Sequence, residues 1–507
     1  MTPDPRPLLP IGAALISAAA SGPILDAGFP DRDWWPFTFF GIALVLLSLV
    51  GRRPRAALLV GFIAGLAFYF THIEWAALFL GPVPLVALSV LMSLFVALGA
   101  LGISLAYRWG PRVWPGAFGR LALLPAIVAG LWTAREAISS NWPYGGFAWG
   151  RASLSQSQSP FSDLFPWLGV SGVSFAMVAL VAVAIEAARL TSVARVTRAV
   201  IAVGVLAALL VIPAFPFTTS GTARIAAVQG NGKAAYFDSR QQGDLLEAQY
   251  TATEPLFGEP GIDMVVWPEG ASDIDPLVYP YAAQVFDAVS RRMDAPLIAG
   301  AITERDGRIY NTSLLWKAGE GAVDLFDKRH PIPFAEYVPN RSFWEPFAPE
   351  LIGLIGREYT AGTTDTVFDV NGIVAGINIC FDISDDGVMT DAVRDGAEVL
   401  LAQTNNADFG RTDESVQQLA IARIRALELA RSVVNISTVG TSAIIAPDGL
   451  TIDRLPTYTA ATMVASVPLS STTTPAAVAG RAIEWFVSGL GLAGVLIAGL
   501  NERKSHA

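Results

Sequence analysis

The 507-residue sequence contains a single cysteine, only three histidines and few charged residues. One cysteine, Cys380, cannot form an intrachain disulfide, and the three histidines lie far apart in the chain. The common zinc-binding patterns of paired cysteines and histidines are therefore missing, and we predict neither a metal nor another cofactor. Charged residues make up only 15% of the chain, whereas ordinary soluble domains contain about 25%.

The shortage of charge is uneven along the chain. Residues 220–480 contain 18 Lys and Arg against 34 Asp and Glu, a net charge of −16, and the remainder has 16 against 10, a net charge of +6. An acidic, water-compatible block is thus inserted in an apolar, slightly basic chain. A strongly acidic block argues against nucleic acid as a partner, because nucleic-acid binding requires basic patches.

Long hydrophobic runs fill most of the remaining chain. Most of them have about 17–25 residues, the length that crosses a bilayer as a helix. Seven precede the acidic block and one follows it: residues 8–25, 35–50, 56–79, 84–107, 121–138, 167–188, 199–215 and 482–500. We therefore predict a polytopic membrane protein with eight spans.

Arginine in the short loops predicts the orientation of these spans. Nearly all basic residues of the short loops and the C-terminal tail lie in alternate loops and in that tail: Arg52, Arg53, Arg55, Arg108, Arg112, Arg120, Arg189, Arg195, Arg198, Arg503 and Lys504. Cytoplasmic loops are enriched in Lys and Arg, so both termini should be cytoplasmic and the acidic block should face outward. The predicted domains are a transmembrane domain (1–217), an extracytoplasmic domain (218–470), and a linker with the eighth helix and tail (471–507).

The acidic block has the pattern of an α/β domain. Amphipathic helical stretches are predicted near 240–256, 282–292 and 415–430, and the segment 468–480 resembles a linker. Ten apolar, β-branched runs are predicted strands: 224–229, 264–267, 296–302, 312–316, 366–370, 373–379, 399–403, 433–439, 442–445 and 462–467.

Three reactive side chains stand at or just beyond the ends of predicted strands. Glu269 follows a buried-type strand and a proline that ends it, although alone it could be a solvated loop acid. Lys328 is one of only four lysines, in a chain that otherwise uses Arg as its cation, although a surface basic pair with Arg329 is also possible. Cys380 ends a long apolar strand and could be an inert buried thiol or a nucleophile.

Together the three groups make a complete acyl-transfer site. A carboxylate can take the thiol proton, and an ammonium favours the thiolate and stabilises the oxyanion of a tetrahedral intermediate. The backbone N–H near Phe381 could be a second oxyanion donor. This chemistry requires no histidine, and His330 beside Lys328 is interpreted as a packing or capping residue.

These motifs resemble those of a known family. The order is Pro268-Glu269, then Lys328 ahead of Pro333-Phe334-Ala335-Glu336-Tyr337-Val338-Pro339, then Ile379-Cys380-Phe381-Asp382. It is similar to the nitrilase, or carbon–nitrogen hydrolase, superfamily. Combined with the predicted spans it resembles the bacterial apolipoprotein N-acyltransferases over nearly the full length. The resemblance implies an αββα sandwich domain inserted between spans seven and eight.

The resemblance also implies a reaction and its partners. A phospholipid, typically phosphatidylethanolamine, would donate its sn-1 acyl chain to Cys380, and the α-amine of a lipoprotein's diacylglyceryl-cysteine would accept it. The enzyme would be a monomer in the bacterial cytoplasmic membrane. Glu269 would be the base, Lys328 the oxyanion stabiliser, and Glu336 a second acid beside Lys328. Further residues match substrate-binding or pocket positions: Gln229, Asn311, Tyr337, Asp382, Asn405 and Tyr144.

The sequence departs from the family pattern at several positions. Phe381 and Asp382 stand where many members have Tyr and Glu, Gly270 follows the predicted base in place of Thr or Ser, and Tyr236 and Phe237 stand where a Trp is common. These departures leave the triad intact but put the lipid or acceptor preference in doubt. Two alternatives stay open: a membrane-tethered amidase that uses water as the acceptor, and a non-enzymatic membrane protein.

Overall fold

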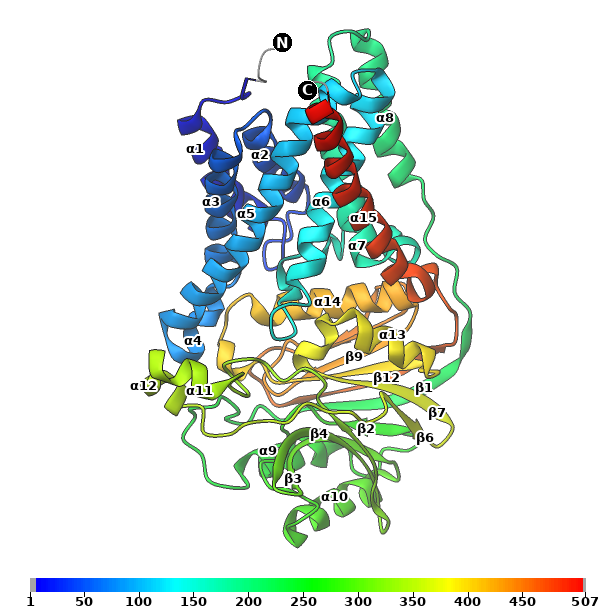
Figure 1. The fold of residues 1–507 in the computed structure, drawn as a ribbon. Helices are drawn as coiled ribbons and strands as arrows, with labels where there is room; N and C mark the ends of the chain where they lie inside the picture. Colours follow the sequence, from blue (N-terminus) through cyan, green and yellow to red (C-terminus); the bar gives the residue numbers. More distant parts are fainter. Residues whose placement is uncertain (1–5, 505–507) are drawn as a thin grey trace. The chain divides into compact units, whose positions relative to one another are not determined.

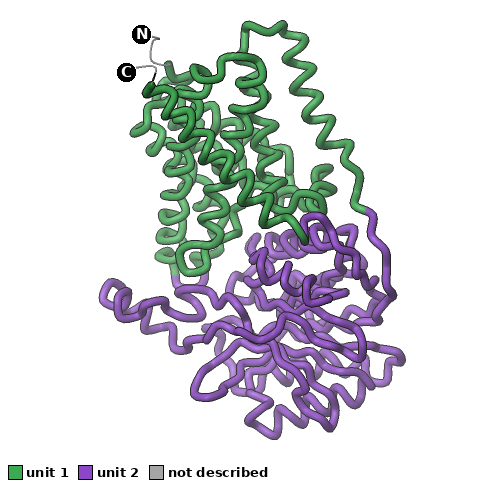
Figure 2. The backbone as a smooth tube through the Cα atoms, turned by 45° about the vertical axis from the view of Figure 1, so that its right-hand side comes forward, with its two compact units in different colours: residues 1–77, 81–215, 478–507 green, residues 78–80, 216–477 purple. Residues whose placement is uncertain are grey.

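The computed structural model describes residues 6–504, and the chain folds into two compact units (Figure 2). Among the described residues, the helical unit contains 6–77, Gly81–Phe215 and 478–504, and the α/β unit contains Leu78–Leu80 and Pro216–Ala477. The predicted domain limits at 217 and 470 therefore differ from the observed limits at 215 and 477. Residues 1–5 and 505–507, at the ends of the predicted first and third segments, lie outside the described residues.

Each predicted hydrophobic run contains a helix of the helical unit (Figure 1). In the described part of the chain, five segments have the length and apolarity to cross a membrane, whereas α1 and α2 are apolar but shorter and α8 has 16 residues. The count of eight spans therefore stays a prediction. The helices are α1 (Ile11–Asp26), α2 (Pro36–Leu49), α3 (Pro54–His72), α5 (Pro82–Val113), α6 (Leu124–Ser139), α7 (Phe165–Arg189), α8 (Arg195–Leu210) and α15 (Pro475–Lys504).

Close contact between these helices depends on glycine. A Cβ atom on Gly130 of α6 would lie 2.3 Å from the carbonyl oxygen of Val487 in α15, and one on Gly491 would lie 2.4 Å from the carbonyl carbon of Gly130. Small residues let helix backbones approach one another in apolar surroundings, where packing rather than water exclusion drives association. The α6–α15 contact is of this kind.

Two boundaries differ from the predictions. The third run was predicted to continue to residue 79, but α3 ends at His72, and Glu74 begins a separate 3-10 helix because Ile73 leaves the helical conformation. The predicted linker at 468–480 is also wrong. Strand β12 continues to Ser470 and α15 begins at Pro475, where the hydroxyl of Thr474 accepts the Ala477 backbone N–H and so caps the helix start.

The α/β unit contains two six-stranded sheets. The first has the order β12-β1-β2-β3-β4-β5, with bounds Ala461–Ser470, Thr219–Gln229, Met264–Val266, Leu297–Arg305, Arg308–Lys317 and Gly321–Asp327. The second has the order β11-β10-β9-β8-β7-β6, with bounds Thr451–Arg454, Ala443–Ile445, Ser432–Ser437, Val399–Thr404, Ile373–Ile379 and Val367–Val370. The predictions missed β5 and β11, which lie at sheet edges and keep several exposed side chains, so they lack a buried strand's apolar run.

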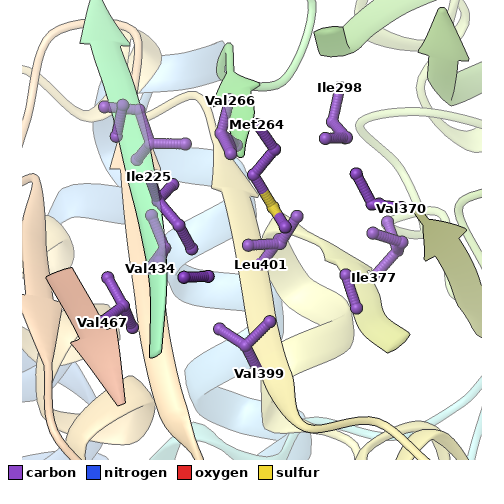
Figure 3. Close-up of a cluster of buried hydrophobic side chains, with 14 of the residues drawn as sticks. Ile225, Met264, Val266, Ile298, Val370, Ile377, Val399, Leu401, Val434 and Val467 are labelled. Atoms are coloured by element: carbon purple, nitrogen blue, oxygen red, sulfur yellow. The ribbon is translucent and has the colours of Figure 1, made fainter. Parts of the chain in front are cut away.

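The apolar side chains between the two sheets form the core of this unit (Figure 3). Ile225 and Met264 of the first sheet pack in one buried cluster with Leu401 and Val434 of the second. Because side chains alternate along a strand, the other face of each sheet also needs a cover.

Helices cover both outer faces (Figure 1). On the first sheet lie α9 (Asp244–Thr253) and α10 (Pro280–Met293), the latter burying Phe286 and Val289. On the second lie α13 (Asp386–Arg394) and α14 (Glu414–Leu429). The unit is thus an α/β domain with two packed sheets between helical layers, the αββα arrangement implied by the resemblance.

Candidate active site

The three predicted reactive residues each stand just beyond the end of a strand of the α/β unit. Glu269 follows β2, Lys328 follows β5 and Cys380 follows β7. All three are buried, with 7%, 1% and 6% of their surfaces exposed. Buried ionisable groups require partners, and the contacts of these three define the candidate site.

Glu269 is held by neighbours on both sides. Its Oε1 atom accepts hydrogen bonds from Asn311 Nδ2 at 2.7 Å and from Lys328 Nζ at 3.2 Å. Its backbone carbonyl accepts the Thr438 hydroxyl at 3.3 Å. The adjoining strand passes very close, because a Cβ atom on Gly300 of β3 would lie 2.4 Å from the Pro268 carbonyl oxygen and 2.7 Å from Glu269 Cα.

The close approach at Gly300 gives a first prediction. The Gly300→Ala change should displace the Glu269 backbone, lowering the free energy of unfolding by about 1–3 kcal/mol and acyl-transfer activity by roughly 100-fold, as misplacement of a reacting group does. The matched control is Gly221→Ala in β1, where the nearest atom to a new Cβ is 4.0 Å away. Thermal unfolding and the turnover rate are the measurements. If the two variants had the same thermal stability and the same turnover rate, the role of Gly300 in positioning Glu269 would be contradicted.

Lys328 lies between two carboxylates. Its Nζ atom is 2.9 Å from Glu336 Oε1 as well as 3.2 Å from Glu269 Oε1. Its backbone N–H donates to the Asn311 carbonyl at 2.9 Å, which fixes the residue beside β4. Burial alone would lower the pKa of Lys328, but the two carboxylates raise it well above its ordinary value. The side chain therefore remains a buried cation throughout the physiological range.

Glu336 completes this arrangement from the loop after Lys328. Besides Lys328, its Oε1 atom accepts from Asn311 Nδ2 at 3.3 Å, and its Oε2 atom accepts the Ile332 backbone N–H at 2.7 Å. One ammonium thus faces two carboxylates. Burial raises the pKa of Glu269, Lys328 opposes that rise and Glu336 adds to it, for a net increase. A carboxyl whose pKa lies nearer neutrality is better matched to general base work.

Cys380 adopts a backbone conformation that is rare for its residue type. Its φ is +52°, in the left-handed region, and it begins the 3-10 helix Cys380–Ser384 directly after β7. A sharp, strained turn after a strand makes the side chain of a nucleophile project away from the strand backbone, where a substrate can reach it. Burial and then Glu269 raise the pKa of the thiol, Lys328 lowers it, and the net result lies well above the ordinary value. At rest Cys380 is therefore a neutral thiol that needs a base.

Asp382 connects the Cys380 turn to the Lys328 segment. Its carboxylate is fully buried and accepts the backbone N–H of Arg329 at 3.1 Å and that of His330 at 2.8 Å. Burial raises the pKa of Asp382 to about 6, although its hydrogen bonds and positive neighbours oppose the rise. Asp382 thus holds the backbone of the Lys328 segment, and the substrate contact implied by the resemblance stays a prediction.

The other residues implied by the resemblance have different surroundings. Gln229 is fully buried, and its amide bonds the carbonyls of Pro456 and Thr459 and the hydroxyl of Ser442. Asn405 bonds the Ala234 carbonyl and the Ala407 N–H. Both therefore hold loops.

Four further predicted residues lie in different parts of the structure. Asn311 is brought into the cluster of charges by its contacts with Glu269 and Glu336. Tyr337 and Phe381 are half-buried beside Glu336 and Cys380 in the chain. Tyr144 belongs to the helical unit.

A buried polar group beside Cys380 had not been predicted. Gln418 of α14 donates its side-chain N–H to Cys380 Sγ at 3.7 Å, and Asn406 and Glu414 lie behind it. The apolar spacing of α14 predicts a helix but does not predict that its buried face carries glutamines. A polar pair, Gln417-Gln418, within that helix is the one signal in the sequence. Within residues 6–504, no group of three His, Cys, Asp or Glu side chains is arranged to hold a metal.

Comparison with known proteins shows which family the chain resembles. Residues 21–184 match the model of the apolipoprotein N-acyltransferase N-terminal domain, and residues 224–476 match that of carbon-nitrogen hydrolases. A protein of Mycolicibacterium smegmatis named apolipoprotein N-acyltransferase is 31% identical over 97% of this chain and 86% of its own length. One of Vibrio parahaemolyticus with the same name is 24% identical over 92% of both chains.

Solved structures of the nitrilase superfamily also align with part of the chain. Saccharomyces cerevisiae Nit3 covers 49% of this chain and 91% of its own, at 18% identity and a TM-score of 0.38. The sequence relatives, by contrast, extend over both the helical and the α/β units. The chain belongs to the apolipoprotein N-acyltransferase family.

Proposed function

We propose that this enzyme moves a fatty acyl chain from a phospholipid, through a Cys380 thioester, to the N-terminal α-amine of the diacylglyceryl-cysteine of apolipoproteins. Membership of the N-acyltransferase family supports the overall reaction. The observation that supports the residue roles is the position of Lys328, held between Glu269 and Glu336 and acting electrostatically on the Cys380 thiol. This is the order of base, cation and nucleophile that acyl transfer requires.

In the first half-reaction, Glu269 takes the thiol proton and Cys380 Sγ attacks the sn-1 ester carbonyl. Lys328 stabilises the oxyanion that forms, and the backbone N–H after Cys380, at Phe381, is a second donor. The tetrahedral intermediate then expels the glycerol oxygen, which takes the proton back from Glu269. A lysophospholipid leaves and a thioester remains.

The second half-reaction repeats these steps with an amine. The α-amine of the acceptor attacks the thioester carbonyl and loses a proton to Glu269. The intermediate collapses with Cys380 thiolate as the leaving group, and the proton returns to sulfur. The products are an amide-linked acyl chain on the lipoprotein and a resting enzyme, with no net change in protonation.

The surrounding residues prepare these steps. Glu336 keeps Lys328 charged and in place through its 2.9 Å contact, and it is available to exchange a proton with Glu269 across the ammonium. Asn311 restrains Glu269, and Asp382 holds the backbone beside Lys328. Activity therefore depends on residues that never touch a substrate.

The membrane arrangement is part of the proposal. The basic residues of the short loops favour eight spans with both termini in the cytoplasm and the α/β unit on the outer face of the bacterial cytoplasmic membrane. There the site would meet the outer-leaflet phospholipid, with phosphatidylethanolamine as donor, and lipoproteins that have already crossed. We further propose that the enzyme acts as a monomer.

The proposal is tested by supplying the purified full-length enzyme with phospholipid labelled in its sn-1 chain and a synthetic diacylglyceryl-cysteine peptide. The expected products are labelled triacyl peptide and lysophospholipid in equal amounts. Label in free fatty acid, or release of ammonia from small amides without a labelled peptide, would favour the tethered amidase in place of the acyltransferase.

A further inference from the structure

A line of buried polar side chains connects α14 to the sulfur of Cys380. Asn406 Nδ2 donates to Glu414 Oε2 at 2.8 Å and to Gln418 Oε1 at 2.6 Å. Gln418 Nε2 in turn donates to Cys380 Sγ at 3.7 Å. Glu414, Gln418 and Asn406 are 2%, 1% and 1% exposed, so burial of these groups is tolerable only because they satisfy one another.

The orientation of the Asn406 amide follows from its partners. Its Oδ1 atom accepts the hydroxyls of Thr404 at 2.8 Å and Ser437 at 2.7 Å. Hydroxyl groups could accept or donate, but the Glu414 oxygen Oε2 on the other side accepts, so the NH₂ end of Asn406 faces Glu414 and Gln418. An amide has two N–H donors and one carbonyl acceptor, and every one of them is used here.

The Asn406 amide therefore determines the direction of the Gln418 amide. Because Gln418 Oε1 accepts from Asn406, its NH₂ group must be the end that meets sulfur. In the reversed orientation, the NH₂ groups of Asn406 and Gln418 would lie 2.6 Å apart. The Gln418 carbonyl oxygen would then face Cys380 Sγ and would repel a thiolate. The contact is therefore a donor aimed at the reacting atom.

We propose that Gln418 is a further catalytic residue, whose amide N–H donates to Cys380 Sγ and stabilises the thiolate, with Asn406 and Glu414 as its positioning residues. The inference rests on the proposed role of Cys380 as nucleophile and adds a donor to it. The thiolate occurs twice in the cycle, as attacking group and as leaving group, so one hydrogen bond lowers the energy of both charged states.

The charges around the thiol make such a donor necessary. Burial and the carboxylates of Glu269 and Glu336 raise the pKa of Cys380, Glu414 adds to that rise where it is ionised, and Lys328 lowers the pKa. Lys328 is already shared between two carboxylates. Burial raises the pKa of Glu414 to about 8, so at neutral pH it is mostly protonated and adds little negative charge beside the sulfur. The Gln418 N–H, unlike the Lys328 ammonium, donates to Cys380 Sγ without being shared with a carboxylate.

The test compares Gln418→Met with wild type in the alkylation of Cys380 by iodoacetamide, using the full-length protein. Because Cys380 is the only cysteine, the label reports this thiol alone. Loss of the N–H should move the alkylation midpoint up by about one pH unit and slow labelling at pH 7 about tenfold. The rate at the high-pH plateau should be unchanged, and the kcat of acyl transfer should fall about tenfold with little change in KM.

Two further variants make the outcome decisive. Gln418→Glu keeps the shape and the acceptor for Asn406 but places a carboxylate oxygen at the sulfur, so its midpoint should rise further than that of Gln418→Met. Gln417→Met, the same change one position earlier on α14, should leave the wild-type midpoint. A midpoint unchanged in both Gln418 variants, or a plateau rate lowered in parallel with the rate at pH 7, would overturn the proposal.

The result also separates this inference from the proposed function. If Cys380→Ser retains acyl transfer, the nucleophile itself is misassigned and the proposed function fails at that point. If Cys380 is essential but both Gln418 variants titrate like wild type, only the role of Gln418 fails.

Discussion

We expect the Cys380→Ser variant to lose acyl transfer on the order of 10⁴-fold or more, the scale seen when a nucleophile is removed from a group of residues that act together. Serine is nearly the same size, so the turn after β7 should persist. A hydroxyl, however, has a far higher pKa than a thiol, and the Glu269 carboxylate is too weak a base to ionise it. The measurement is the rate at which a labelled acyl chain reaches a diacyl lipopeptide.

Folding and labelling provide the controls for this variant. Its thermal unfolding should match that of wild type, and iodoacetamide should label nothing because no other cysteine exists. Transfer within tenfold of wild type by a folded Cys380→Ser protein would remove the thioester from the mechanism.

The second large effect is expected at Lys328. The Lys328→Met variant should lose about 10³-fold in kcat, because an oxyanion donor and the cation opposite the thiol disappear together. It should also unfold more easily, by about 3–5 kcal/mol at neutral pH, since Glu269 and Glu336 are left buried without their shared cation. The measurements are the turnover rate and thermal unfolding.

The pH dependence of this variant has a definite sign. Lys328 lowers the pKa of Glu269 against the effect of burial, so its removal moves that pKa further up. A larger fraction of the base is then protonated at neutral pH, and residual activity should rise as the pH increases. The matched control is Lys317→Met at the end of β4, which should keep wild-type activity. A Lys328→Met enzyme within tenfold of wild type would show that the ammonium is not needed.

The sequence was sufficient to place the three reactive residues, for a physical reason. Glu269 and Cys380 each follow a short apolar run that is recognisable as a buried strand, and strand ends are where a sheet presents reactive side chains. Lys328 follows β5, a strand that the sequence did not predict. Glu269 stood out because a proline ends its strand, Lys328 because lysine is scarce in the chain, and Cys380 because it is the only cysteine. Three of the four outer helices, α9, α10 and α14, and ten of the twelve strands followed from hydrophobic periodicity, whereas α13 was not predicted.

The features that could not be predicted depend on contacts between distant segments. Asp382 holds the backbone of Arg329 and His330, some 50 positions earlier, and Gln418 meets Cys380 from another helix. Apart from the polar pair Gln417-Gln418, nothing in the local sequence marks such contacts. The edge strands β5 and β11 were missed because exposed strands lose the apolar pattern. The linker predicted at 468–480 was too long, because only 471–474 lies between β12 and α15 and Ser, Thr and Pro also cap helices.

The central claim is that the acyl chain is carried on Cys380 between donor and acceptor. Its most direct test is to incubate the purified full-length enzyme with phospholipid labelled in the sn-1 chain, without acceptor, and to determine the mass of the peptide that contains Cys380. We predict a hydroxylamine-sensitive acyl adduct on Cys380, one lysophospholipid released per adduct, and transfer of the label to a diacyl lipopeptide added afterwards. Labelled lipopeptide formed without any such adduct, or an adduct that the lipopeptide does not discharge, would contradict the account.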